Sequence, residues 1–161
     1  MTLELSMPKR KMNNKKIQSL SIQVLQLKDV SFIQHIDLTN NLKWPLCYYF
    51  KSITTPCFYS YVARIGDGYV GSIMFRISMS VMYIDRILVD QSYRRAGIGA
   101  RLLEEGLGVA KKENAEKALL TASINNIIAL NFYLKNGFKV DNIRSDYYSK
   151  NEDGVRMKRL L

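Results

Sequence analysis

The feature that most restricts the fold of this chain is a run of three strand-forming segments, 58–65, 69–78 and 82–89, joined by short turns. β-Branched and aromatic residues are frequent in each segment, and residues 66–68 (Gly-Asp-Gly) have the composition of a hairpin turn. Short turns favour antiparallel neighbours, because a parallel pair needs a crossover of about a dozen residues or more. The run therefore predicts an antiparallel centre for the sheet.

Strand and helix patterns flank this centre on both sides. Further strand patterns occupy 22–27, 118–124, 138–143 and 155–160. Helical spacing occupies the segment after Asp29, with Phe32, Ile33 and Ile36 on one stripe, then 48–53, 97–113, and 126–136 with Ile127, Leu130 and Leu134 on one face. Together the patterns predict a single α+β (mixed α/β) domain.

Composition excludes several functional classes. The 161 residues include one histidine, His35, and two cysteines, Cys47 and Cys57, which rules out a disulfide scaffold and leaves no plausible zinc site. The single histidine also argues against a hydrolase with a Ser-His-Asp or Cys-His catalytic arrangement. No apolar run approaches the ~18 residues of a membrane span, and the N-terminus lacks the apolar core of a signal peptide. We therefore expect a cytoplasmic protein without a membrane partner.

The net charge of +10 is distributed over two regions. Residues 1–19 carry five basic residues against Glu4, and we expect a basic flexible leader there, followed by a folded domain over 20–161. The short basic cluster fits a nuclear-import or ribosome-contact segment, but the pattern favours a plain disordered extension. The positive body suits an anionic partner, such as a phosphorylated cofactor or the RNA-rich ribosome surface, or else is a solvated surface. Direct DNA binding is not expected.

A glycine-containing turn follows the third central strand. Gly97 and Gly99 begin the next helix, and glycines there allow a ligand to approach the backbone closely. The unpaired N–H groups of a first helical turn attract anions, and Arg94 and Arg95 add positive charge. The segment predicts a phosphate cradle unlike a P-loop or a three-glycine dinucleotide motif. A purely structural turn is the alternative.

The run Arg94-x-x-Gly97-x-Gly99 resembles the pyrophosphate loop of the GCN5-related N-acetyltransferase (GNAT) family. A second family signature follows in the expected order, carried by Asn126, Ala129, Phe132, Tyr133, Lys135, Gly137 and Phe138. The resemblance covers roughly residues 20–160. It implies a GNAT-like single domain, with a mostly antiparallel twisted sheet of about six or seven strands flanked by about four helices. It also implies acetyl-CoA as cosubstrate and no metal ion.

The resemblance assigns acetyl-CoA binding to the strand end, the glycine loop and a later helix. These residues are Ile87, Leu88, Val89, Arg94, Arg95, Ala96, Gly97, Ile98, Gly99, Ala100, Asn126, Ala129 and Tyr133. Backbone N–H groups of 87–89 would polarise the thioester carbonyl. By the same resemblance, Tyr133 would protonate the leaving thiolate.

Within the family the chain is most similar to N-terminal protein acetyltransferases of the NatE catalytic-subunit type. Residues 44–46 match an aromatic-proline-aliphatic loop, Tyr83 stands at the catalytic tyrosine position, and 147–148 match paired tyrosines of the loop between the last two strands. The implied peptide site consists of Trp44, Pro45, Leu46, Tyr48, Tyr83, Asp85, Tyr147 and Tyr148.

The chain departs from the family pattern at Thr121, where relatives carry a histidine or glutamate base. Asp85 lies two residues after Tyr83, on the same face of the strand, and could replace that base, attract the substrate ammonium or pair with a nearby cation. A peptide α-amine titrates near ~7.7–8.0 and is partly neutral at pH 7, whereas a lysine amine at ~10.4 is not. A site with a weak base therefore suits α-amines.

We therefore expect an acetyl-CoA-dependent enzyme that acetylates peptide or nascent-chain N-termini by direct attack in a ternary complex. The expected catalytic residues are Tyr83, Tyr133, Thr121 and Asp85. The resemblance implies other N-terminal acetyltransferase subunits and the ribosome as partners. Two alternatives remain: a small-molecule (polyamine or other amine) acetyltransferase, for which Asp85 alone gives too little acidity, and a non-catalytic CoA-binding subunit, which Thr121 suggests and the intact glycine loop disfavours.

Overall fold

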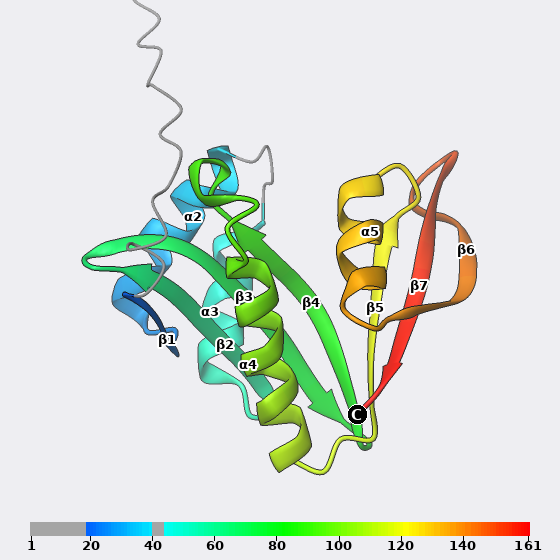
Figure 1. Cartoon of the computed structure of the whole chain (residues 1–161), viewed down its shortest axis with the longest axis horizontal. Coiled ribbons are helices and arrows are strands. Elements are labelled where there is room, and N and C mark those ends of the chain that lie inside the picture. Colours follow the sequence, from blue (N-terminus) through cyan, green and yellow to red (C-terminus); the bar gives the residue numbers. More distant parts are fainter. Residues whose placement is uncertain (1–18, 40–43) are drawn as a thin grey trace, which may run out of the picture.

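The structure, a computed structural model, describes residues 19–39 and 44–161, so the predicted leader lies almost wholly outside it. A seven-stranded sheet in the order β1-β2-β3-β4-β5-β7-β6 forms the centre (Figure 1). The strands are β1 (Leu20–Val24), β2 (Phe58–Ile65), β3 (Gly68–Ser78), β4 (Val81–Val89), β5 (Lys117–Ser123), β6 (Lys139–Ser149) and β7 (Glu152–Leu160). The helices are α2 (Val30–Thr39), α3 (Leu46–Thr54), α4 (Ile98–Lys112) and α5 (Ile127–Lys135), with short 3₁₀ turns η1 (Leu27–Asp29) and η2 (Gln91–Tyr93). The predicted fold class is confirmed.

The sheet consists of two parts that separate from one another. Strands β1 to β4 form one antiparallel ladder, and β5, β7 and β6 form another. The two parts meet only where Val81–Tyr83 of β4 pair in parallel with 117–119 of β5. Beyond Tyr83 the strands diverge, and Figure 1 shows the opening between β4 and β5. The remaining length of β4 therefore has one edge without a neighbouring strand.

Helices cover both faces of the sheet. On one face, α2 and α3 pack through Ile33, Ile36 and Tyr49 against the first part of the sheet. On the other face, α4 and α5 belong to the larger apolar cluster. Gly106 of α4, which the sequence suggests only as a weak point of the helix, lies so close to β3 that an added Cβ would be 2.9 Å from Ile73 Cδ1. The glycine therefore lets α4 pack tightly against β3 and β4.

Several local details differ from the prediction. The predicted helix is present as α5, but of its three apolar residues on one face only Leu130 packs against the core. Ile127 and Leu134 are 59% and 49% exposed, and Tyr133 is the residue that turns inward onto Phe138. Phe32 of α2 is half exposed and stacks on Tyr69, with ring centroids 4.5 Å apart. The predicted first strand ends early, at Val24, because the chain turns into η1.

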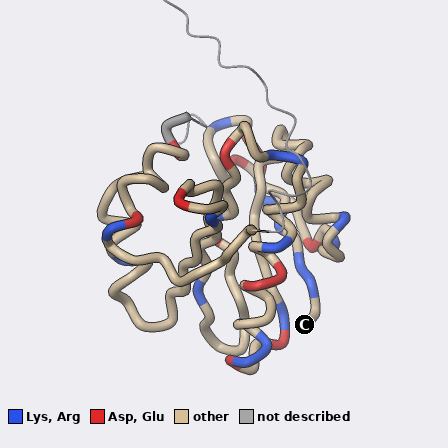
Figure 2. Tube along the Cα trace, turned by 60° about the vertical axis from the view of Figure 1, so that its left-hand side comes forward, with Lys and Arg blue, Asp and Glu red and all other residues tan. Residues whose placement is uncertain are grey.

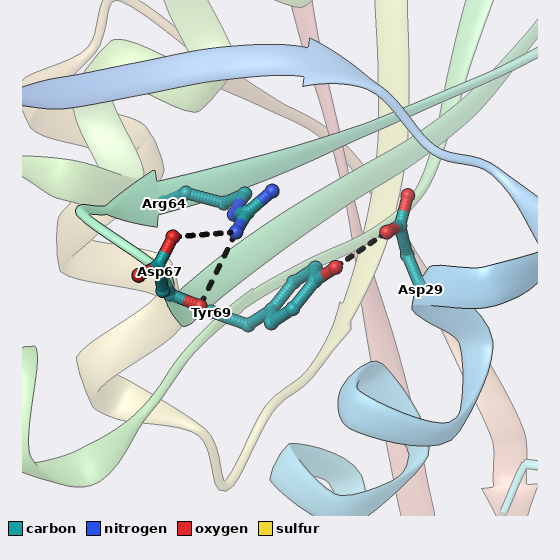
Figure 3. A network of polar contacts seen from close by, with 4 residues as sticks. All are labelled: Asp29, Arg64, Asp67 and Tyr69. Carbon is teal, nitrogen blue, oxygen red and sulfur yellow. Dashed lines mark hydrogen bonds and ion pairs between the residues drawn. The ribbon is translucent and has the colours of Figure 1, made fainter.

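A polar network fixes that turn against the sheet. The Asp29 carboxylate accepts the Gln26 N–H at 2.8 Å. It also accepts the Tyr69 hydroxyl at 2.6 Å, which ties η1 to β3 (Figure 3). Arg64 lies over the Tyr69 ring at 4.7 Å and donates to the Asp67 carbonyl at 3.3 Å. These contacts hold the start of α2 on the sheet, on the face opposite α4.

Charged residues are spread over many elements, with Lys and Arg interspersed with Asp and Glu along the trace (Figure 2). Within residues 19–39 and 44–161, no helix is long and apolar enough to cross a membrane. The same part of the chain contains no cluster of three or more histidine, cysteine, aspartate or glutamate side chains arranged to hold a metal ion.

Candidate active site

The open edge of β4 presents backbone groups to the gap. The Asp90 N–H donates to the Val70 carbonyl at 3.0 Å, so the N–H groups of even-numbered residues near this end of β4 point toward β3. Alternation along the strand then directs the N–H groups of Ile87 and Val89 toward the opening. These are two of the three strand residues that the sequence assigns to cosubstrate binding. They are placed to donate hydrogen bonds to a group lying between β4 and β5.

The turn after β4 is shaped for close approach to its backbone. Asp90 accepts the Ser92 N–H at 2.8 Å and starts η2, and Arg95 and Gly97 both have positive φ values, 67° and 79°. Helix α4 then begins at Ile98, with its first N–H groups unpaired within the helix. A Cβ added at Gly97 would meet no atom within 4 Å, so the space above this glycine is open.

Positive charge lies around the same turn. Arg94 and Arg95 are exposed, and Arg94 Nε donates to the Val89 carbonyl at 3.3 Å. A helix N-terminus with two guanidinium groups beside it is a favourable place for a phosphate. The geometry therefore fits the pyrophosphate that the sequence motif predicts.

Helix α5 lies against the start of α4. The Asn126 side chain caps it by accepting the Ala129 N–H at 3.0 Å, and the Phe132 ring would be 3.4 Å from a Cβ at Gly99. Tyr133 is 8% exposed, and its burial raises the pKa of its phenol well above the usual range. A phenol in this environment is protonated at neutral pH, but the raised pKa also makes it a weaker acid, so the role predicted for Tyr133 at the leaving thiolate stays a prediction. The cosubstrate contacts predicted for Asn126 and Ala129 stay predictions.

At the other end of β4, most residues of the predicted peptide site line a cavity of about 430 Å³. Its predicted lining residues are Trp44, Tyr48, Tyr83, Asp85, Thr121, Tyr147 and Tyr148. Pro45 and Leu46 do not line it; both are exposed next to Trp44. Tyr133, Asn126 and the glycine loop lie outside its walls, so the predicted residues fall into two groups.

Asp85 sits at an irregularity in β4. The register with β3 shifts so that Met74 pairs with Arg86 and Phe75 with Ile84, which leaves Asp85 as the extra residue of a bulge. Its Oδ1 is 3.2 Å from Arg76 Nε, so pairing with a cation, one of the three predicted options, is present. Its Oδ2 is buried and forms no hydrogen bond within the described part of the chain.

Burial and neighbouring charges perturb the Asp85 carboxyl and the tyrosine beside it. Burial raises the pKa of the Asp85 carboxyl, although the Arg76 guanidinium acts in the opposite direction. Burial and the neighbouring Asp85 charge raise the pKa of Tyr48. Arg76 also lies over the Tyr83 ring, 5.3 Å from its centroid. Arg76 thus interacts with Asp85, Tyr83 and Tyr48. It is a residue of the site that the sequence analysis did not identify.

Thr121 lies on the opposite wall, in β5. The Tyr148 hydroxyl donates to the Thr121 carbonyl at 2.8 Å, which fixes the tyrosine over this strand. Gly154 leaves room for this arrangement, because a Cβ there would be 2.7 Å from Thr121 Cγ2 and 2.9 Å from Tyr147 Cβ. The tyrosine pair was predicted in a loop; it lies near the end of β6, where the register with β7 breaks between Arg144 and Ser149.

Sequence reasoning also missed Arg144 and Arg156, which line the cavity from β6 and β7. Both stand in strand segments that are rich in other charged residues, so no local signal separates them from solvent-facing positions. Their position follows from the order of the sheet, which places β7 between β5 and β6.

Comparison with known proteins assigns the family. The profile of the acetyltransferase (GNAT) family matches residues 27–138, and the chain belongs to this family of acetyltransferases, as predicted. The N-alpha-acetyltransferase 30 of Xenopus laevis is 28% identical over 143 residues, which is 85% of this chain and 51% of that protein. The N-alpha-acetyltransferase 50 of Danio rerio is 27% identical over 138 residues, 80% of this chain and 82% of that protein. The chain thus spans about half the length of the first relative.

A solved structure supports the same fold. The Arabidopsis thaliana protein NAA60, in complex with acetyl-CoA, superposes with a TM-score of 0.80 over 88% of this chain and 98% of that one. The identity is 13%, so this likeness concerns the fold alone. The predicted similarity to N-terminal protein acetyltransferases is confirmed at the level of modest sequence identity.

Proposed function

We propose that this chain is an N-alpha-acetyltransferase that moves an acetyl group from acetyl-CoA to the N-terminal amine of a peptide or nascent protein. One observation carries the proposal: both ends of β4 are built for ligands. The open backbone cradle around Gly97 lies at one end, and the cavity with Tyr83 and Asp85 lies at the other. Tyr83 and Val89 are six residues apart, about 20 Å along a strand. The N–H groups of Ile87 and Val89 lie between the cavity and the cradle.

Acetyl-CoA fits the cradle on chemical grounds. Its pyrophosphate would meet the first N–H groups of α4, the open space at Gly97 and the charges of Arg94 and Arg95. Bound there, acetyl-CoA supplies an acetyl thioester. The N–H groups of Ile87 and Val89 would then polarise a carbonyl placed in the opening.

In the proposed transfer, a C–N bond to the α-amine forms and the C–S bond breaks. The amine loses one proton and the sulfur gains one. Tyr83 and Asp85, which line the cavity, would pass on the proton of the amine, and Tyr133 is proposed to supply the one needed at sulfur, although its burial raises its pKa. Direct attack in a ternary complex requires both ligands at once, which the separate positions of cradle and cavity allow.

Three observations favour an α-amine as the acceptor. Thr121 provides no strong base, and an α-amine needs less help than a lysine to become neutral. The relatives described above carry the name N-alpha-acetyltransferase. A polyamine substrate is disfavoured because three arginines and only one carboxylate line the cavity. Action in the cytoplasm, at the ribosome and with other acetyltransferase subunits belongs to this proposal.

The test is incubation of the full chain with acetyl-CoA and a panel of peptides that differ in their first two residues. Mass spectrometry is expected to locate the new acetyl group on the α-amine. Matched peptides with a blocked α-amine and a free lysine serve as the control and should react poorly. If acetyl-CoA binds but no peptide is acetylated at any pH, the proposed function is refuted, which leaves a small-molecule acetyltransferase or a CoA-binding subunit.

A further inference from the structure

The cavity at the Tyr83 end of β4 has an excess of positive charge. Arg76, Arg144 and Arg156 line it together with a single carboxylate, Asp85. Arg76 is paired with Asp85 at 3.2 Å, so these two charges largely offset one another. Arg144 and Arg156 carry the remaining charge among the lining residues, on the far side of the opening, where the Glu152 carboxylate near Tyr148 offsets it in part.

These two arginines point to the same side of the sheet. Arg156 pairs with Thr121 across β5 and β7, and Arg144 pairs with Gly154, two residues before Arg156. Because side chains alternate along a strand, positions two apart share a face. The wall that carries Thr121 therefore also carries two guanidinium groups, opposite Asp85 on β4.

Neither arginine is neutralised by a dedicated partner. The Arg144 guanidinium lies over the Tyr147 ring at 5.4 Å, and within residues 19–39 and 44–161 no carboxylate pairs with it. Arg156 Nε is 3.6 Å from Asp141, but Asp141 also binds Lys158 Nζ at 2.9 Å. One carboxylate thus serves two cations, and the cavity wall keeps a net positive charge.

We infer that the enzyme prefers N-termini whose second or third residue carries a carboxylate. The inference rests on the proposed function, and it names the substrate class. An extended peptide advances about 3.5 Å per residue, so these side chains would lie within about 7 Å of the reacting amine. Asp85 would face the amine and the arginines would face the acidic side chain. Guanidinium groups suit this task because they bind carboxylates through two parallel hydrogen bonds.

The first experiment compares kcat/KM for three peptides that are identical except for Glu, Gln or Lys at positions two and three. We expect the Glu peptide to exceed the Gln peptide about fivefold, and the Lys peptide to be poorest, as for a partly exposed ion pair. The advantage of the Glu peptide should shrink as salt rises. Equal values for all three peptides would overturn the inference.

The second experiment locates the preference. Arg144→Gln and Arg156→Gln should each lower the Glu-to-Gln ratio of kcat/KM severalfold. Lys139→Gln is the matched control: it removes the same charge from an exposed position of β6 outside the cavity, and it should leave the ratio unchanged. Acetylation of neutral peptides without any charge preference would refute this inference and spare the proposed function. No acetylation of any peptide would refute the proposed function itself.

Discussion

Beyond Val89, one end of β4 offers backbone N–H groups, glycines and an open space, whereas around Tyr83 the other end offers side chains from α3 and five strands. At the Val89 end, the ligand would contact the backbone of one short continuous segment of the chain. At the Tyr83 end, the cavity brings together residues that are up to 112 positions apart, from Trp44 to Arg156. The first is therefore visible as a motif in the sequence, while the second exists only once the sheet has formed. It also follows that changes at the two ends should affect different steps.

The largest expected effect is at the glycine end. Gly97→Glu should weaken acetyl-CoA binding at least ~100-fold, about 2.7 kcal/mol, because a negative side chain would enter the space predicted for the pyrophosphate. The positive φ of 79° adds strain. Calorimetry on the folded variant measures the affinity.

Gly66→Glu is the matched control for this change. Gly66 also has a positive φ, 57°, and an added Cβ there meets nothing within 4 Å, but it lies in the β2–β3 turn. This variant should bear the same strain and keep its affinity for acetyl-CoA. If the folded Gly97→Glu protein also binds normally, the loop is only structural.

A tenfold or larger loss of kcat is expected from Tyr83→Phe, because the change removes one hydroxyl from the proposed proton path. The affinity for acetyl-CoA should hardly change, since Tyr83 lies about 20 Å from Val89 along β4. Steady-state kinetics with a saturating cosubstrate gives kcat. Tyr59→Phe, a change in β2 outside the cavity, is the control and should be active. Unaltered turnover of Tyr83→Phe would make Tyr83 a wall residue.

Asp85→Asn should reduce kcat/KM about fivefold, and the parameter that changes distinguishes its roles. A fall in kcat indicates that Asp85 accepts the proton, whereas a rise in KM indicates that it attracts the ammonium. Its raised carboxyl pKa makes it a better base than an exposed aspartate. Initial rates over a range of peptide concentrations separate the two, and no change in either parameter would leave Asp85 only as the partner of Arg76.

The smallest effect on catalysis is expected from the buried ion pair between Asp37 of α2 and Arg86 of β4, which we expect to affect stability instead. Burial raises the pKa of Asp37 to about 6 despite the guanidinium. Between about pH 4 and pH 6 the folded chain thus holds a proton that the unfolded chain has lost, so the free energy of unfolding should fall as pH rises through this range.

Urea unfolding of wild type and Asp37→Asn from pH 4 to 7 tests this dependence. The variant should lose the downward slope, whereas His35→Gln, which removes the single histidine from the same helix, should keep it. A slope that persists unchanged in Asp37→Asn would assign it to other groups.

Much of the fold follows from local sequence. The central strands were predicted nearly to the residue, because alternating β-branched residues and a Gly-Asp-Gly turn leave few options. The face of α5 that turns toward the core was not predicted. Ile127 and Leu134 are as apolar as the residues that the helix buries, and only the packing of Tyr133 against Phe138 shows which face is inside.

The site shows the same division. The motif around Gly97 was found from spacing, and the family resemblance supplied Tyr83, Tyr148 and the missing base at Thr121. Arg144 and Arg156 were not found, because whether an arginine faces solvent or a cavity depends on which strand becomes its neighbour. The pairing of Asp85 with Arg76 was open for the same reason: it needs the register between β3 and β4 and its bulge.

On this proposal the two ends of β4 act together on an α-amine without a strong base at Thr121. The pH dependence of kcat/KM for a peptide with a free α-amine, measured for the wild type and for Thr121→His, tests this. We expect weak activity near pH 7, a rise until the α-amine is neutral above ~8, and equal or higher activity of Thr121→His at pH 7. A flat profile from pH 6.5 to 9, or equal reaction of a lysine in an α-blocked peptide, would contradict it.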